Sequence, residues 1–450
     1  MLLSVLLGAA VAQNTAPPES PPPEVTPVTP VEPTEPALPS PAPPEPAPSP
    51  SPAPPPAPVP APAPTPKPAP APAPAPLTPK PAPKPATKPS APLTIVMSVP
   101  HVSAVDGRKE YRTDVKTLAL SQARSDALRA AGKVTVSLEA DVRRFLKSLE
   151  RDAQDARFAY DPSARAWRLG MQFGVRPDVD ATLAAVQRAL KDTQQGRVNV
   201  VYERRAPSRT IDFFLKRGVT ALIGEGVTNY AGSSQARMTN IHVGANKLRD
   251  LLFEGTEFSF NRVVGPVDLA HGFVPGLVIS GERTTSGVGG GICQVSTTVF
   301  RALYAAGLPV KERRNHSYQV HYYEPQGLDA TIYQPTQDLK FANDTGAAIW
   351  FQVEWNDRAA RLAVQAFGKP RAETVVVAAP RVLSRQAPPP ARYVLDASLR
   401  PGRRVQVDWS APGAVIEVER SFVLDGRIVR RDVLRSVYRP WPNIYLVGPS

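Results

Sequence analysis

The sequence predicts an α+β fold preceded by a long disordered segment, and three observations support this. Most of the 55 prolines lie between Pro17 and Pro92 in Pro-Ala repeats. Such repeats lack backbone donors and apolar bulk, so they form extended polyproline II rather than a core. From about residue 93, helical periodicity and strand-like alternation follow one another, and beyond residue 371 only strand patterns remain.

The first twelve residues are an apolar run that ends in Ala10-Val11-Ala12. An apolar core followed by small residues is typical of a secretory signal peptide, although no Lys or Arg precedes this one. The run is shorter than the roughly 20 residues that cross a bilayer, and we expect no transmembrane helix in the mature chain. The prediction is an exported, extracytoplasmic protein of the cell envelope, the periplasm or the medium.

Residues 13–92 form the predicted Pro/Ala-rich disordered linker, a semi-rigid spacer that would hold a domain away from a surface. A low-complexity tail without a specific task is the alternative. The net charge is +13, and the excess of positive charge lies in the part that folds. Because export argues against nucleic acid, the predicted partner is peptidoglycan or another anionic wall polymer. Simple solubility explains the charge equally well.

Residues 93–215 are predicted to form a small α+β domain. The elements expected there are strands at 93–100, 134–137 and 197–204, a helix capped by Ser137, a hairpin at 155–170 and a helix after Pro177.

Residues 218–370 are predicted to form a second α+β domain, in which a cysteine-bearing helix packs against an antiparallel sheet. The helix begins at Ile292 and stops at Gly307. Residues 371–450 form a β-rich C-terminal region, either a separate sandwich-like module or further strands of the second domain. The other elements expected in the second domain are a helix at 237–252 and strands at 318–323, 330–334, 339–343 and 348–355.

Residues 231–346 contain an ordered series of blocks that includes Arg237-x-x-Asn240-Ile241, Glu257-Phe258-Ser259-Phe260-Asn261, Gly289-Gly290-Gly291-Ile292-Cys293-Gln294, Glu312-Arg313, Asn315-His316-Ser317, Gly327-x-Asp329-Ala330-Thr331 and Asp338-Leu339-Lys340-Phe341. Through these blocks the segment resembles the VanW family. The resemblance implies an envelope protein of the kind associated with vancomycin-resistance gene clusters, and it names no reaction. One departure is Glu254-Gly255-Thr256-Glu257, where the family usually has a Pro-Gly-Glu-type turn.

Asp155, Ala156 and Phe158 are the chief residues through which the preceding segment, about 140–215, resembles the YoaR-like peptidoglycan-binding module.

The single cysteine, Cys293, rules out internal disulfides and is the candidate nucleophile. It falls in the first turn of the predicted helix, where free N–H groups and the positive end of the helix dipole favour a thiolate. His316 is the candidate base and Asp329 the carboxylate that orients it. This chain order is similar to that of transglutaminase-like thiol enzymes. A buried cysteine that serves only as a small hydrophobe is the alternative.

Three glycines precede the cysteine and leave the backbone bare, so that a substrate could approach closely. Nearby polar residues would complete the binding site, or would serve the structure alone. The predicted substrate-binding residues are Gly289, Gly290, Gly291, Gln294, Ser296, Arg237 and Asn240.

No metal and no cofactor are predicted. His316 and His321 are five residues apart, which on a strand places them on opposite faces, and no second cysteine exists. The stretch from Gly287 to Ile292 lacks the Lys-Ser/Thr ending of a phosphate-binding loop.

Two functions follow from these residues. The first is a cysteine-dependent amide hydrolase or transferase that acts on peptidoglycan. The second is a non-catalytic wall-binding or scaffold protein linked to envelope integrity or the glycopeptide response, and an oxidant-sensing thiol is a lesser third. The sequence leaves open the substrate, the oligomeric state and whether the protein is an enzyme.

Overall fold

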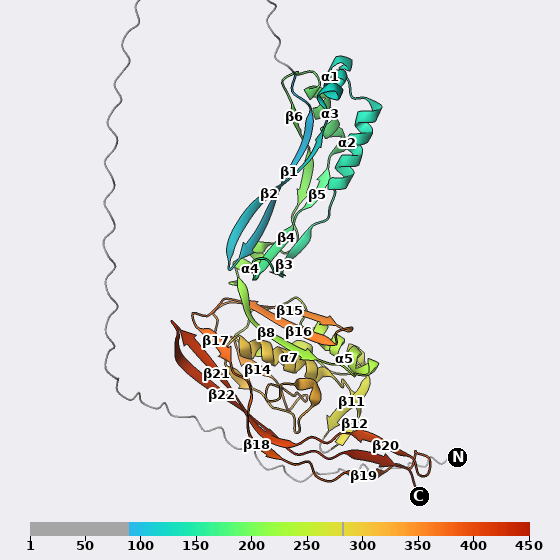
Figure 1. Cartoon of the computed structure of the whole chain (residues 1–450), viewed down its shortest axis with the longest axis vertical. Helices are drawn as coiled ribbons and strands as arrows, with labels where there is room; N and C mark the ends of the chain where they lie inside the picture. The colour runs from blue at the N-terminus through green and yellow to red at the C-terminus, as the bar shows by residue number, and fades with distance from the viewer. Residues whose placement is uncertain (1–89, 281–282) are drawn as a thin grey trace, which may run out of the picture. The chain divides into compact units, whose positions relative to one another are not determined.

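The computed structural model describes residues 90–280 and 283–450 (Figure 1). The predicted signal peptide and almost all of the predicted linker lie outside these residues. The α+β fold class is confirmed, with short helices and mainly antiparallel sheets alternating along the chain. Among the described helices, none combines the length and the apolar character needed to cross a membrane.

The first part of the fold is a five-stranded sheet with helices beside it. β1 lies between β2 and β4, β3 pairs with β4, and β6 pairs with β1 in parallel. The apolar faces of the helices α1, α2 and α3 bury their leucines and valines against β1. The elements are β1 (Thr94–Val105), β2 (Arg108–Ala119), α1 (Gln122–Ala131), α2 (Val136–Leu149), β3 (Gln154–Asp161), β4 (Ala166–Gln172), β5 (Gly174–Pro177), α3 (Val179–Ala189), β6 (Arg197–Asn199), β7 (Tyr202–Arg205) and α4 (Ile211–Leu215).

The predicted hairpin and the helix after Pro177 are confirmed, whereas three other predictions are wrong. β1 does not end at Pro100, because the strand continues through it and pairs it with Thr113. At Pro100 β1 pairs with β2 alone, so no second neighbouring strand needs the missing N–H of the proline. Residues 134–137 are not a strand and Ser137 is not the cap, since Thr135 caps α2 by accepting a hydrogen bond from the Leu138 N–H and Ser137 lies inside the helix.

The second part is built on the antiparallel sheet β8-β16-β15-β9, on which helix α7 lies. Gly224 and Gly226 of β8 allow this contact, because a Cβ at either position would lie about 2 Å from a carbonyl oxygen of α7. The predicted packing of the cysteine-bearing helix on an antiparallel sheet is therefore confirmed. The elements are β8 (Ala221–Asn229), α5 (Gln235–Asn246), β9 (Leu251–Phe253), α7 (Ile292–Ala305), β15 (Ile349–Asn356) and β16 (Arg361–Gly368).

Smaller elements surround α7, and three predictions about them need correction. The helix predicted over 237–252 ends at Asn246, since Leu251–Phe253 pairs with β15 instead. Residues 318–323 form a loop and the 3-10 turn η2, where the Gln326 side chain bonds to the Val320 carbonyl, and 330–334 forms only isolated bridges. The elements are β10 (Glu257–Ser259), α6 (Phe260–Val264), η1 (Leu269–His271), β11 (Pro275–Ser280), β12 (Arg283–Val288), β13 (Val310–Glu312), η2 (His321–Tyr323) and β14 (Lys340–Ala342).

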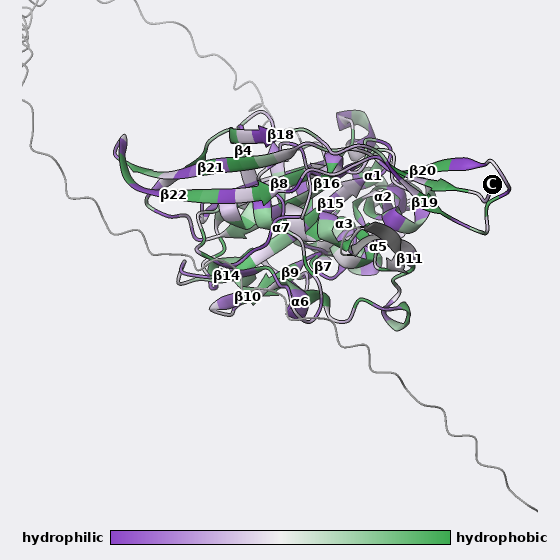
Figure 2. Ribbon diagram, turned by 90° about the horizontal axis from the view of Figure 1, so that it is seen from below, coloured by the Kyte–Doolittle hydropathy of each residue, from purple (hydrophilic) through white to green (hydrophobic). Residues whose placement is uncertain are grey.

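The described residues after 370 contain strands alone, as predicted. Hydrophobic and hydrophilic residues alternate along the long hairpin of β21 and β22 (Figure 2). Val418 of β21 is buried in the same hydrophobic cluster as α7, which favours further strands of the second domain over a separate module. The elements are β17 (Thr374–Val377), β18 (Arg381–Gln386), β19 (Arg392–Leu395), β20 (Arg404–Asp408), β21 (Gly413–Leu424), β22 (Arg427–Tyr438) and β23 (Ile444–Val447).

Candidate active site

The glycine loop forms the start of helix α7. Gly289 and Gly291 have positive φ angles of 87° and 114°, and Gly291 is the N-cap of the helix. A Cβ on Gly291 would lie 2.9 Å from the Arg237 carbonyl oxygen, so only glycine fits there. The loop carbonyls accept hydrogen bonds from the N–H groups of Ile292 and Gln294. Two of the N–H groups that the sequence predicted to be free at the helix start are therefore already bonded.

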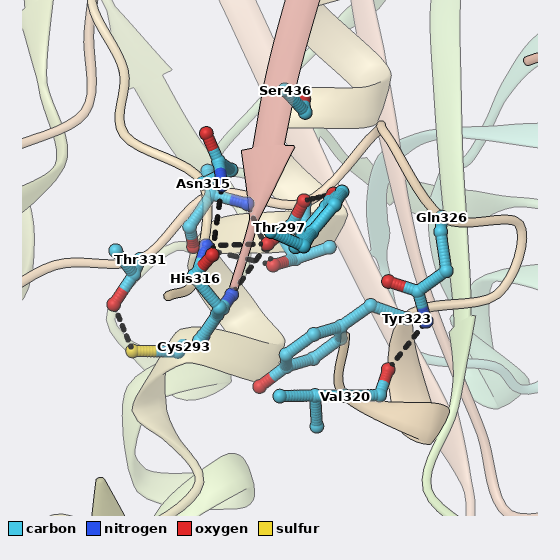
Figure 3. Close-up of polar contacts among 12 residues, drawn as sticks. Cys293, Thr297, Asn315, His316, Val320, Tyr323, Gln326, Thr331 and Ser436 are labelled. Carbon is cyan, nitrogen blue, oxygen red and sulfur yellow. Dashed lines mark hydrogen bonds and ion pairs between the residues drawn. The ribbon is translucent and has the colours of Figure 1, made fainter. Parts of the chain in front are cut away.

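The structure brings Cys293, His316 and Asp329 together from three separate segments. Figure 3 shows Cys293 and His316 beside each other. The His316 Nδ1 lies 2.6 Å from Asp329 Oδ2, and the His316 backbone N–H donates to the same oxygen at 2.8 Å. A carboxylate only accepts, so Nδ1 carries the proton and Nε2 is the nitrogen that hydrogen-bonds with the thiol. His316 and Asp329 are 5% and 1% exposed, whereas Cys293 is half-buried.

The thiol and the imidazole shift each other's ionisation. Burial raises the pKa of Cys293, but the hydrogen bond and the positive charge of His316 outweigh it and bring that pKa below its usual value. Burial lowers the pKa of His316, and hydrogen bonds with Asp329 and Cys293 reverse this and raise it to about 9. Asp329 is also desolvated, yet its bonds to His316 and the Arg313 charge hold its pKa far below the usual range. These opposite shifts favour a thiolate beside an imidazolium over a neutral thiol beside a neutral imidazole.

This ionisation predicts how the thiol reacts with iodoacetamide. We expect the pH midpoint of alkylation of the folded protein to lie below the ordinary cysteine value of about 8.5, because the hydrogen bond and charge of His316 favour the thiolate. Stopped-time alkylation followed by mass spectrometry measures this rate at each pH. A midpoint at or above about 8.5, or labelling only after denaturation, would contradict the assignment.

Two residues that the sequence did not assign to the site, Tyr438 and Arg313, hold the second oxygen of Asp329. The Tyr438 hydroxyl donates to Oδ1 at 2.5 Å, and Arg313 Nη2 lies 3.3 Å from the same atom. Arg313 Nη2 also donates to Ser436 Oγ at 2.9 Å. Burial raises the pKa of Tyr438, so its hydroxyl stays protonated and remains a donor. Arg313 lay in a shared motif, but Tyr438 and Ser436 lay in a stretch whose pattern indicated only strands.

Aromatic rings and one cation border the imidazole. The Tyr323 ring stacks on His316 with centroids 4.6 Å apart, and its hydroxyl hydrogen-bonds with Arg237. The Arg237 guanidinium lies 4.1 Å above the Tyr322 ring. His321 does not bond to the thiol; its ring lies against Tyr322. Burial, together with the Arg237 charge, lowers the pKa of His321, so His321 is neutral where His316 is charged.

Three of the predicted substrate-binding residues use their polar groups inside the protein. Asn240 binds the Val274 backbone and the Gly290 carbonyl, which fastens the glycine loop to α5. Gln294 accepts from Arg237 at 2.7 Å and donates to the Asn229 carbonyl. The Ser296 hydroxyl donates to the Ala330 carbonyl at 2.6 Å. All three side chains are fully buried, so they form the walls of the site.

Of the remaining predicted substrate-binding residues, Gly289 and Gly290 are buried, whereas Gly291 and Arg237 are partly exposed. Arg237 is only partly buried, and no hydrogen-bond partner for its Nε occurs in residues 90–280 or 283–450. The same described ranges contain no cluster of three or more His, Cys, Asp or Glu residues able to hold a metal ion.

Comparison with known proteins gives a family match to the same region. Residues 236–365 match the model of the family described as VanW like protein. The chain is 38% identical to Uncharacterized protein YoaR of Bacillus subtilis (strain 168) over 136 residues, which are 30% of this chain and 45% of that protein. It is 28% identical to Vancomycin B-type resistance protein VanW of Enterococcus faecalis (strain ATCC 700802 / V583) over 161 residues, 34% of this chain and 58% of that protein. The chain thus spans about half the length of the curated relatives it matches.

Two solved structures are also similar to part of the chain. One is "IgA1 Protease G5 domain structure", which is 16% identical, covers 17% of this chain and 93% of that chain, and has a TM-score of 0.12. The other is "Crystal structure of HP0197-G5", which is 21% identical, covers 16% of this chain and 97% of that chain, and has a TM-score of 0.09. Similarities with TM-scores this low add nothing to the assignment of the fold.

Proposed function

Since residues 236–365 form a VanW-like domain, we propose that this domain is the catalytic part of an exported cell-envelope protein. The proposed reaction is hydrolysis or transfer at an amide bond of the stem peptides of peptidoglycan. Cys293 is the nucleophile, His316 is the acid and base, and Asp329 holds the imidazole in position.

The buried hydrogen-bonded chain from Cys293 through His316 to Asp329 is the observation that supports this proposal. Burial of an ionised carboxylate and an imidazolium costs several kcal/mol before pairing. A cysteine that served only as a small hydrophobic residue would not need a buried carboxylate and imidazolium beside it. Perturbed groups that meet a partly exposed nucleophile at a helix start are typical of thiol enzymes.

The same geometry supports a two-step reaction. The Cys293 sulfur attacks the carbonyl carbon, and the His316 imidazolium gives its Nε2 proton to the leaving amine as the C–N bond breaks. The product is a thioester on Cys293. Water then gives a proton to the neutral imidazole and attacks the thioester, which releases a carboxylic acid and returns the thiol. If an amine attacks in place of water, the outcome is transfer.

The cell-wall substrate is inferred from two separate observations. One relative is named as a vancomycin resistance protein, and vancomycin acts on the cell wall. The net charge of +13 suits an anionic polymer. Export follows from the predicted signal peptide and from a substrate outside the membrane.

The proposal is tested with purified muropeptides and mass spectrometry of the products. We expect new carboxyl and amino ends to appear with the untreated protein, and to disappear after alkylation with iodoacetamide, which has only Cys293 to modify. Equal products from the alkylated protein would contradict a thiol mechanism. If no product forms but the protein co-sediments with sacculi in low salt, the non-catalytic wall-binding alternative holds instead.

A further inference from the structure

We propose that the hairpin of β21 and β22 completes the active site, with Tyr438 as a positioning residue for Asp329. This proposal rests on the proposed role of Cys293 and His316 as a reacting pair. Tyr438 touches neither of them, so it acts through the carboxylate. The residue lies far beyond residue 365, where the family match ends.

The two oxygens of the Asp329 carboxylate have different hydrogen-bond partners. Oδ2 faces His316 and accepts from both its ring and its backbone. Oδ1 accepts from Tyr438 at 2.5 Å and from Arg313 at 3.3 Å. Asp329 is 1% exposed and Tyr438 2%, so water does not replace these donors. The carboxylate is thereby prevented from rotating away from the imidazole.

Tyr438 is itself fixed by the loop that it supports. Its hydroxyl oxygen accepts from the Gly327 N–H at 2.9 Å. Two residues earlier in the same strand, Ser436 donates to the Gly327 carbonyl at 3.2 Å and accepts from Arg313. Side chains two apart on a strand share a face, so β22 holds the loop before Asp329 at two consecutive inward positions.

The other strand of the hairpin supports the same loop. Gly327 has a φ angle of 98°, and a Cβ there would lie 2.8 Å from Ile416 Cγ2 and 3.3 Å from Val418 Cγ2 of β21. The Arg313 Nε also donates to the Asp329 carbonyl at 2.7 Å. The segment that carries the carboxylate is therefore packed on β21, bonded to β22 and fastened by Arg313.

This arrangement predicts a change in the pH dependence of the thiol. Without the Tyr438 hydroxyl, Oδ1 keeps one weak donor in a buried place, and a carboxylate with an unsatisfied oxygen turns toward other donors. The His316 imidazolium then loses part of its stabilisation, and the thiolate beside it becomes less favourable. A residue that only stabilised the fold would leave this ionisation unchanged.

The experiment measures the alkylation rate of Cys293 against pH in four folded proteins. Asp329→Asn removes the carboxylate charge, so it gives the direction and the upper limit of the shift in the pH midpoint of alkylation. We expect Tyr438→Phe to raise the pH midpoint in the same direction by roughly 0.7 pH unit, a fivefold change in the ionisation equilibrium that corresponds to one hydrogen bond. Tyr304→Phe is the matched control, since its buried hydroxyl lies 3.5 Å from the Val418 carbonyl of the same hairpin. Its profile should equal that of the wild type.

A Tyr438→Phe profile that coincides with the wild type or moves opposite to Asp329→Asn would overturn the proposal. If that variant does not fold, Ser436→Ala takes its place, because it removes the neighbouring hydroxyl. Its alkylation profile is then compared with those of the wild type and Asp329→Asn. Because alkylation needs no substrate, the result is independent of turnover. A shifted profile in a protein that cleaves no muropeptide would refute the proposed reaction and leave the positioning role intact.

Discussion

Cys293→Ala is expected to reduce turnover of muropeptides by roughly a thousandfold or more, since removal of the nucleophile of a catalytic triad has effects of at least this size. The fold should remain, because the side chain is only half-buried at the edge of the core and, besides its bond with His316, makes only long hydrogen bonds to Thr331 and Ile332 at 3.5 and 3.7 Å. Mass spectrometry of products measures the loss, and thermal melting shows that the variant is folded.

Cys293→Ser is the matched variant, because it keeps the volume and a hydrogen-bonding atom. A hydroxyl is not ionised by the His316 imidazolium in the way that a thiol is, so we expect a loss of similar size. A folded Cys293→Ala protein with wild-type turnover would refute the proposed nucleophile. Wild-type turnover in the serine variant alone would show that the site does not depend on a thiolate.

Gly226→Ala is expected to have the largest effect on stability. Its Cβ would lie 2.0 Å from the Thr298 carbonyl oxygen and 2.7 Å from the Ala302 nitrogen, both in the backbone of α7. A helix backbone cannot move as a side chain can, so the whole of α7 must shift on the sheet. Overpacking of this kind costs about 3 kcal/mol or more, which corresponds to a Tm lower by roughly 5–10 °C.

Gly170→Ala is the control for this prediction. Gly170 also lies in a strand, but its φ is ordinary and no neighbouring atom lies within 4 Å of the added Cβ. Its Tm should stay within about 2 °C of the wild type. Differential scanning fluorimetry compares the two variants, and an equal Tm for both would show that α7 does not approach β8 as closely as described.

The three residues of the proposed triad could be predicted from the sequence because each has distinctive chemistry. Cys293 is the sole thiol and falls at a helix start, while His316 and Asp329 follow in shared motifs. Gln294 and Ser296 were predicted as substrate contacts because polar residues beside a nucleophile suggest a binding face. The structure buries both, and a sequence pattern does not tell a polar wall residue from a substrate contact.

Tyr438 could not be found in the same way. It occupies an inward position of a strand, where the alternating pattern predicts a core tyrosine. Its contact with Asp329 spans 109 residues and depends on how the last strands fold back over α7. The 318–323 stretch misleads for a related reason, since its alternation is typical of a strand while side-chain bonds such as that of Gln326 shape it into a turn.

Arg420 of β21 shows that these last strands also matter for when the domain can fold during synthesis. Its buried guanidinium donates to the Tyr304 and Leu308 carbonyls just at the C-terminal end of α7, at 2.9 and 3.0 Å, and pairs with Asp432. A positive charge there complements the helix dipole, as the thiolate does at the other end. A nascent chain that has reached residue 370 still lacks both the Arg420 donor at the C-terminal end of α7 and the Tyr438 donor to Asp329. We therefore expect this domain to close only after β21 and β22 have been synthesised.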